Sequence, residues 1–279
     1  MNDPLPARVQ TLLRLLSDPD EQIAQTIQEE LAKMGTAVLP ILEPAKTEHP
    51  ALAARLDQVI QDIHFPQLLV TFRQGLQESS LDWEQGAFLI ARLRQPTLER
   101  THYQRILDQF AEEFHAKWNC ESLSIHDAAQ QLAVFLFKDK GFSGNQEQYY
   151  DPDNSFMHLV IDRRLGIPIT LAALYVFVAA RVGIPAVGIG MPGHFLVRIE
   201  GVSPSLYLDA FNKGSWLKEQ DCRQFIAATG LEFQPHYVEP SSTPAILSRM
   251  LRNLLSIYED TNQETMRRRV EALLDCFDS

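Results

Sequence analysis

Two residues in the middle of this 279-residue chain have the types and spacing of an acid–base pair. His194 opens an apolar run that ends at Glu200, and Asp209 lies in the apolar run LYLDAF, 15 residues after the histidine. An imidazole held by a carboxylate acts as a general base toward a thiol, a hydroxyl or a water. A carboxylate among apolar neighbours is costly without a partner, so Asp209 is expected to have one. The two residues predict the base half of a hydrolase or acyl-transfer site.

A nucleophile for this pair is not evident, and two hydroxyl groups are candidates. Thr170 is the second residue of the most apolar helix-length segment, 169–181, and Ser155 lies in the segment DPDNSF. A threonine hydroxyl attacks acyl groups when a strong base is adjacent, although its branched Cβ hinders the attack. Each hydroxyl also has a structural interpretation, because Thr170 can bond to the backbone at a helix start and Ser155 can cap a helix over 156–164. Both interpretations stay open at this point.

Short elements around the pair would position it. Gly-Ile-Pro triplets at 166–168 and 183–185 bound the apolar segment 169–181, which predicts a buried helix. Three runs of strand type follow it: 186–190, 194–200 and 206–211. A turn within 201–205 would join the second and third runs into a hairpin. That hairpin would bring His194 and Asp209 side by side.

The rest of the chain is mainly helical in pattern. Residues 1–64 predict short antiparallel helices that resemble a HEAT-type repeat, 65–240 hold the core with the helices leading into it, and 241–279 predict a helical pair. His64-Phe65-Pro66 is a plausible joint, and the Pro- and Ser-rich stretch 240–244 predicts a linker. The predicted fold class is α+β, rich in helix, with one small antiparallel sheet.

Several short motifs resemble the SirB family of bacterial proteins in order and spacing, over roughly residues 67–258. They are Tyr150-Asp151-Pro152, Asn154-Ser155, Asp162-Arg163-Arg164, Gly166-Ile167-Pro168-Ile169-Thr170 and Pro192-Gly193-His194-Phe195. The apolar helix followed by Gly193-His194-Phe195 and Leu208-Asp209-Ala210 also resembles the transglutaminase-like (papain-type) core. In that core a cysteine-bearing helix precedes strands that carry His and Asp. The resemblance implies a transglutaminase-like fold with helical flanks and catalytic roles for His194 and Asp209.

The sequence departs from that pattern at the nucleophile. Counting back from Gly183 places the cysteine of the family pattern within Pro168–Thr170, and none of these residues is cysteine. One hypothesis is a non-catalytic peptide- or protein-binding or regulatory module that keeps the cleft. The alternative is a hydrolase or acyl transferase in which Thr170 or a water is the nucleophile, His194 the base and Asp209 its orienting group.

Further residues from these motifs and the adjacent strands are predicted to line the cleft. They are Tyr150, Asn154, Ser155, Arg164, Phe195, Phe211, Asn212 and Trp216. Aromatic side chains beside a His–Asp pair are typical of a ligand groove, although aromatic residues near strand ends more often belong to a core. For Arg164 a structural ion pair is the competing interpretation.

Composition limits the partners and cofactors. A net charge of −11 and a pI near 5.2 disfavour nucleic acid, so the expected partner is another protein or a peptide. No segment approaches the ~20 apolar residues of a membrane span, and the N-terminus lacks the pattern of a signal peptide. Cys120, Cys222 and Cys276 form no metal or disulfide motif. We therefore expect a cytoplasmic protein without a metal or cofactor.

Overall fold

The computed structural model describes residues 4–118 and 123–278, so Cys120 lies outside the described residues. Its contacts divide the chain into two compact units. The first unit comprises Met1–Phe72 and Arg92–Thr97, and the second comprises Arg73–Ala91 and Leu98–Ser279. The predicted pair of helices at the C-terminal end therefore belongs to the same unit as the core that precedes it.

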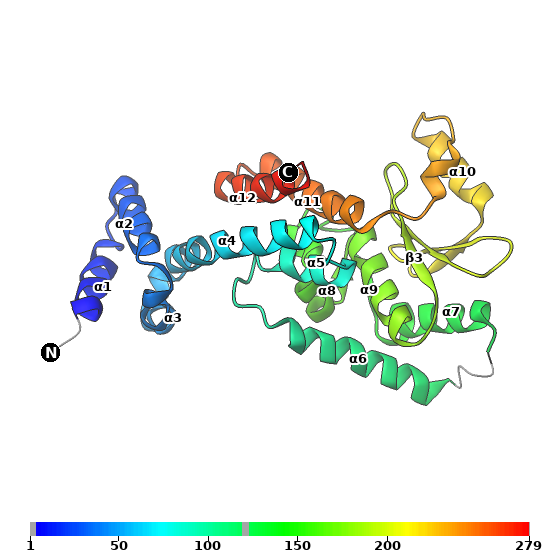
Figure 1. Ribbon diagram of the computed structural model, residues 1–279, viewed down its shortest axis with the longest axis horizontal. Coiled ribbons are helices and arrows are strands. Elements are labelled where there is room, and N and C mark those ends of the chain that lie inside the picture. The colour runs from blue at the N-terminus through cyan, green and yellow to red at the C-terminus, as the bar shows by residue number, and fades with distance from the viewer. Residues whose placement is uncertain (1–3, 119–122, 279) are drawn as a thin grey trace. The chain divides into compact units, whose positions relative to one another are not determined.

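The first unit is built from short helices, drawn in blue in Figure 1. These are α1 (Pro4–Leu15), α2 (Glu21–Lys33), α3 (Leu39–Glu48) and the beginning of α4 (Ala53–Gln77). The Asp20 side chain caps α2 by accepting from the Gln22 N–H at 2.9 Å. Gly35, with φ +67°, follows the helix in the left-handed conformation that glycine adopts without strain. Leu31 of α2, Leu42 of α3 and Leu56 of α4 are fully buried between the helices.

Helix α4 runs through the joint that the sequence predicts at residues 64–66. It continues past Pro66 to Gln77, and the division between the two units falls at Phe72 rather than at residue 64. A proline inside a helix removes one backbone hydrogen bond. Buried apolar residues on both sides of Pro66, Val59 and Phe72 among them, hold the two halves of α4 in place. The local sequence around Pro66 does not show these packing contacts, so it predicts a joint where the helix continues.

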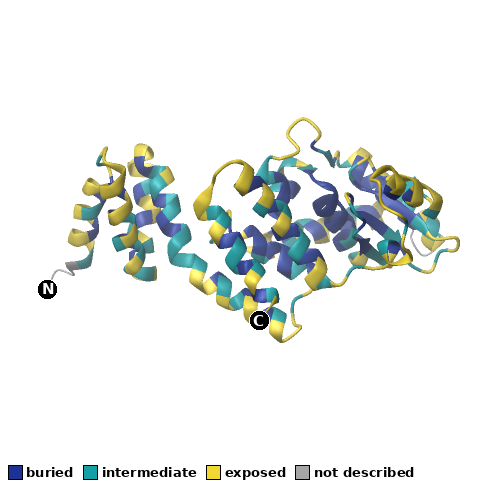
Figure 2. Ribbon diagram, turned by 90° about the horizontal axis from the view of Figure 1, so that it is seen from above, coloured by how far each residue is buried: buried dark blue, intermediate teal, exposed yellow. Residues whose placement is uncertain are grey.

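The second unit surrounds one apolar helix, α9 (Pro168–Arg181). Its other helices are α5 (Trp83–Ala91), α6 (Arg100–Lys117), α7 (Ile125–Val134), α8 (Met157–Arg163), α10 (Glu219–Ala228), α11 (Thr243–Asp260) and α12 (Glu264–Leu274). Helix α9 contacts α5, α6, α7 and α8 as well as the sheet. Because it is enclosed in this way, its residues are apolar on nearly every face, as the sequence predicts. Figure 2 shows the buried positions in dark blue.

A four-stranded antiparallel sheet packs against α9. Its strands, in spatial order, are β3 (Ala186–Ile189), β4 (Leu196–Ile199), β5 (Leu206–Asp209) and β6 (Ser215–Leu217). The three predicted strands are confirmed, and β6 is an addition. A separate parallel pair joins β1 (Ser143–Gly144) to β2 (Leu165–Gly166). The predicted helix-rich α+β fold class is confirmed.

Aromatic packing joins α5 to α9 and to the start of β4. The Trp83 ring lies 5.6 Å from the ring of Phe177 in an edge-on arrangement and 5.7 Å from the ring of Phe195. Rings at these separations add to the stabilisation that burial gives. Phe195 directly follows His194 in the chain, so this packing fixes the backbone that carries the histidine.

Candidate functional site

The hairpin of β4 and β5 places His194 beside Asp209. In the antiparallel register Val197 pairs with Leu208. The residues before β4 and the last residue of β5 therefore lie at the same end of these two strands. His194 Nε2 lies 2.8 Å from Asp209 Oδ2. The two residues are 9% and 5% exposed, respectively, so water does not screen their interaction. The structure therefore brings together the acid–base pair that the sequence predicts.

Asp209 is held as a carboxylate by three donors. Besides the imidazole, the backbone N–H of Asn212 donates to Oδ1 at 3.1 Å, and the Asn212 amide Nδ2 donates to Oδ2 at 2.8 Å. Burial by itself raises the pKa of Asp209, but the bonds from His194 and Asn212 outweigh it and hold that pKa below its ordinary value. An ionised carboxylate only accepts, so His194 donates from Nε2. Its Nδ1 is then the basic atom of the ring.

The backbone around His194 is fixed by a turn and by Arg249 of α11. Gly193 has φ +73°, and the His194 N–H donates to the carbonyl of Met191 at 3.3 Å. The Arg249 guanidinium donates to the carbonyls of Met191 and His194, both at 2.8 Å. The ring of Phe225, from α10, lies 5.3 Å from the imidazole. These contacts leave the histidine little freedom to turn.

A pocket of about 170 Å³ opens where His194 meets the beginning of α9. It is lined by Tyr149, Pro168, Ile169, Gly193, His194, Phe195, Arg249 and Asn253. Pro168 and Ile169 are the first two residues of α9, where unpaired backbone N–H groups favour negative charge. A thiol at this position would face a base and a helix N-terminus together, which is the environment that activates catalytic cysteines. The chain has an apolar residue at both positions.

The Thr170 hydroxyl is used within the protein backbone. The Thr170 side chain is fully buried, its Oγ1 accepts from the N–H of Ile167 at 3.1 Å, and it can donate to the carbonyl of Asn154 at 2.9 Å. Thr170 is not among the residues that line the pocket. The structure thus favours the structural interpretation of this hydroxyl and does not bring it to His194.

Asn154 and Ser155 are buried and do not line the pocket. Fully buried Asn154 donates from Nδ2 to the carbonyls of Gln148 and Tyr149, at 2.7 and 3.3 Å, and so supports the segment that carries Tyr149. The Ser155 Oγ is buried and has no hydrogen-bond partner among the described residues. Phe156, not Ser155, occupies the N-cap position of α8, and it makes no side-chain cap bond. The predicted capping role of Ser155 is therefore wrong.

The other predicted lining residues are dispersed. Phe195 lines the pocket, and Phe211 packs edge-on against the Tyr149 ring at 5.7 Å. Tyr150 is 70% exposed, and Arg164 is exposed at the end of α8 with φ +58°. Asn212 is the partner of Asp209 described above. Trp216 lines a different pocket, of about 400 Å³, because β6 directs it toward α7.

The predicted site residues omit six residues of the pocket: Tyr149, Pro168, Ile169, Gly193, Arg249 and Asn253. Of these, Pro168 and Ile169 lie in the segment where the sequence places the missing cysteine. A weak signal existed for two of them, because Arg249 and Asn253 are four residues apart and so share one face of the predicted C-terminal helix. Nothing in the sequence indicated that this face meets His194. That contact joins residues 55 positions apart in the chain.

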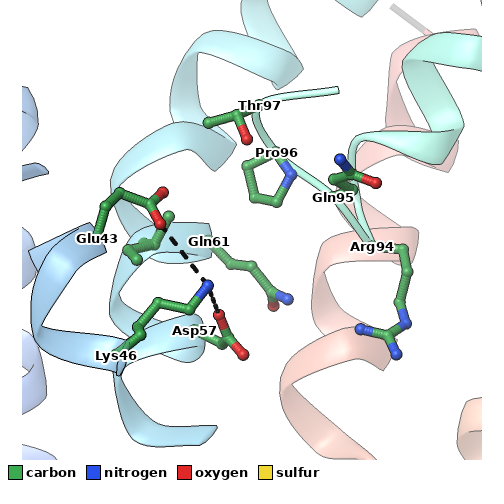
Figure 3. A pocket seen from close by; sticks show the side chains of 9 residues that line it. Glu43, Lys46, Asp57, Gln61, Arg94, Gln95, Pro96 and Thr97 are labelled. Atoms are coloured by element: carbon green, nitrogen blue, oxygen red, sulfur yellow. Dashed lines mark ion pairs between the residues drawn. The ribbon is translucent and has the colours of Figure 1, made fainter. Parts of the chain in front are cut away.

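The first unit has a polar pocket of its own, of about 270 Å³, drawn in Figure 3. Lys46 points at two carboxylates there, with its Nζ 2.5 Å from Asp57 and 3.7 Å from Glu43. The charge of Lys46 is therefore balanced within the unit. The hydrogen bond to Asp57 raises the pKa of Lys46, which keeps its amine protonated and unsuited to act as a base.

Comparison with known proteins identifies the family to which this geometry belongs. A family model described as the transglutaminase-like superfamily matches residues 101–252, which is more than half of the chain. The chain belongs to the transglutaminase-like superfamily. The matched region contains α9, the sheet and Arg249 of α11, so every residue that lines the His194 pocket except Asn253 lies within it. No solved structure matches the chain.

The relatives of this transglutaminase-like chain include bacterial and animal proteins. A UPF0162 protein of Xylella fastidiosa (strain 9a5c) is 36% identical over 192 residues, covering 63% of this chain and 65% of that protein. A UPF0162 protein of Pseudomonas aeruginosa is 29% identical over 177 residues, covering 62% and 64%. F-box only protein 21 of Mus musculus is 35% identical over 130 residues, covering 44% of this chain and 20% of that protein. The bacterial matches confirm the predicted SirB-type relationship. The chain spans less than two thirds of the length of these relatives.

Two other expectations concern metals and membranes. In residues 4–118 and 123–278, no cluster of three His, Cys, Asp or Glu side chains is placed to hold a metal ion. Among the same residues, no helix combines the length and the apolar character that a membrane crossing requires.

Proposed function

We propose that this transglutaminase-like chain is a non-catalytic peptide-binding module whose binding pocket is the former acyl-transfer site. One observation carries the proposal: Pro168 and Ile169 stand at the beginning of α9, opposite His194, where a thiol would have to be. Neither side chain has an atom that can attack an acyl group. No side chain at this position can therefore form a covalent acyl intermediate.

The surface around the pocket suits a peptide. Tyr149, which lines the pocket, is 38% exposed and packs edge-on against Tyr150, which is 70% exposed. Phe225, whose ring lies 5.3 Å from the imidazole of His194, is 39% exposed. Tyrosine and phenylalanine rings provide large contact area at low cost in side-chain entropy, and they are enriched where proteins bind peptides and other proteins. Exposed aromatic rings next to two residues of a small pocket, Tyr149 and His194, suit a bound side chain with flanking main chain.

A hydrolase that activates a water is the second candidate. The pairing of His194 with ionised Asp209 favours it, because this pairing leaves Nδ1 of the imidazole as a base beside the pocket. A version of this enzyme with Thr170 as nucleophile has less support, since both hydrogen-bonding directions of that hydroxyl are engaged by backbone groups. The two functions differ in whether the wild-type protein turns over an acyl substrate.

A turnover assay separates the two candidates. Wild type, His194→Ala and Thr170→Ala are compared for hydrolysis of p-nitrophenyl acetate and of an activated anilide, with thermal unfolding recorded for each. We expect all three proteins to hydrolyse both compounds at the same slow rate, because no group at the beginning of α9 can be acylated. A wild-type rate at least ten times that of folded His194→Ala would establish the hydrolase and overturn the binding module.

A further inference from the structure

Arg249 brings an unbalanced positive charge to the His194 pocket. Its guanidinium is half-buried, donates to the carbonyls of Met191 and His194, and lies 5.5 Å from the centre of the Phe195 ring. Among the described residues, no carboxylate lies within ion-pair distance of Arg249. Carbonyl oxygens satisfy N–H donors but do not neutralise the charge, and an unpaired charge in a partly dry site is costly.

Other half-buried arginines of the same unit show the usual arrangement. Arg181 pairs with Glu84 at 2.7 Å, and Arg198 pairs with Glu200 at 2.7 Å. Burial lowers the pKa of both Arg198 and Arg249, but Glu200 outweighs burial and raises the pKa of Arg198, whereas the pKa of Arg249 stays below its ordinary value. Arg249 thus has the position of an ion-pair partner without the carboxylate.

The remaining walls of the pocket also favour an anion. The beginning of the 14-residue helix α9 presents its positive end at Pro168 and Ile169. His194 is more than nine-tenths buried, and the Asn253 side chain lies one helical turn after Arg249. None of the described residues that line the pocket is acidic. The Asp209 carboxylate is bound to Nε2 of the imidazole and does not line the pocket. In a chain of net charge −11, such a pocket is electrostatically distinct.

We propose that the pocket binds a carboxylate group of a peptide, a ligand class that rests on the proposed function and specifies it. Arg249 and the backbone N–H of Ile169 hold the oxygens, since Pro168 has no N–H, and the side chains of Ile169 and Phe195 contact the apolar part of the same residue. A volume near 170 Å³ is similar to that of a cavity that holds one benzene ring, so a single residue of the peptide enters. The carboxylate is either the C-terminus of the peptide or an acidic side chain.

Three small probes test the charge and its source. Binding to the wild-type protein is measured by calorimetry for N-acetylphenylalanine, for its neutral amide, and for N-acetylglutamic acid α-amide, whose only carboxylate is in the side chain. We expect at least one of the two acids to bind at least ten times more tightly than the neutral amide. Preference for the first acid identifies a C-terminal carboxylate, and preference for the second identifies an acidic side chain.

Variants assign the charge to Arg249. Arg249→Gln is expected to weaken binding of the preferred acid at least tenfold. The matched control is Arg198→Gln, which removes a half-buried arginine that is paired with Glu200 and lies outside the pocket, and its affinity is expected to equal that of wild type. If Arg249→Gln does not fold, the comparison of acid with amide in wild type decides the question alone.

Two results would overturn the carboxylate proposal. Equal affinity for the acids and the neutral amide would show a pocket that binds peptides without using charge, which leaves the proposed function in place. Failure of every probe to bind wild type would also reject it. The proposed function is then judged separately by the turnover assay, which does not depend on Arg249.

Discussion

Replacement of Ile169 by cysteine is expected to give a thiol that iodoacetamide alkylates at pH 6 about 10-fold faster than free cysteine in the same buffer. The side chain at this position lines the pocket with His194 and lies in the first turn of α9. A helix N-terminus and an adjacent imidazole both stabilise the thiolate. Lowering the thiol pKa by ~2 units raises the thiolate fraction at pH 6 by almost 10²-fold, and the accompanying loss of nucleophilicity reduces the net gain to about tenfold.

The control for this reactivity is the same substitution in a His194→Ala protein, where the rate is expected to fall toward that of free cysteine. Pro168→Cys, tested in parallel, shows which of the two positions faces the imidazole. The native Cys222 contributes little, because burial raises its pKa to about 11. Cys120 is replaced by serine in every protein compared. If the thiols of Ile169→Cys and Pro168→Cys both react at the rate of free cysteine, and His194→Ala does not change that rate, then the beginning of α9 does not face His194.

Asp209→Ala is expected to lower the free energy of unfolding at pH 7 by about 1–3 kcal/mol. The substitution leaves His194 Nε2 without its acceptor and removes the acceptor of the Asn212 side chain, both in the partly dry interior of the site. Chemical denaturation at pH 7 measures the loss. A change below about 0.5 kcal/mol would mean that these bonds are replaced by water and that the pair is more open than its burial indicates.

The effect of Asp209 also depends on pH, and Asp209→Asn isolates this dependence. The folded state lowers the pKa of Asp209, so its carboxylate contributes stability that is present above the unfolded pKa of about 3.9 and is lost as the pH falls through the folded pKa. Other carboxylates titrate alike in wild type and variant. The difference in unfolding free energy between the two proteins is therefore expected to shrink below about pH 4. If the difference in unfolding free energy at pH 3 equals that at pH 5, the effect of Asp209→Asn comes from the changed shape of the side chain and not from loss of its charge.

The fold and half of the site were predictable because local patterns determine them. The apolar segment between two Gly-Ile-Pro triplets is observed as α9, and the alternation on either side of residues 201–205 is observed as the β4–β5 hairpin. Once the hairpin forms, its register places His194 next to Asp209. Strand β6 was not predicted because its three residues, Ser215–Leu217, are too few to show the alternation of a strand.

The rest of the site depends on contacts between distant segments. Arg249 reaches the carbonyl of His194 from a helix 55 residues later, and no local pattern encodes that contact. The direction of the Thr170 hydroxyl is set by the carbonyl of Asn154, which is 16 residues away and buried. For this reason the sequence left two interpretations of Thr170 open, whereas the structure places its hydroxyl against the backbone.

Protein acylation tests most directly whether the site keeps its base and lacks only a nucleophile. Wild type, Ile169→Cys and Ile169→Cys with His194→Ala are incubated with p-nitrophenyl acetate and their intact masses are measured, with peptide mapping of any acetyl group. We expect one acetyl group at position 169 that depends on His194, and no His194-dependent acetylation of wild type. A His194-dependent acetyl group on wild type, at Thr170 or any other side chain, would contradict the claim.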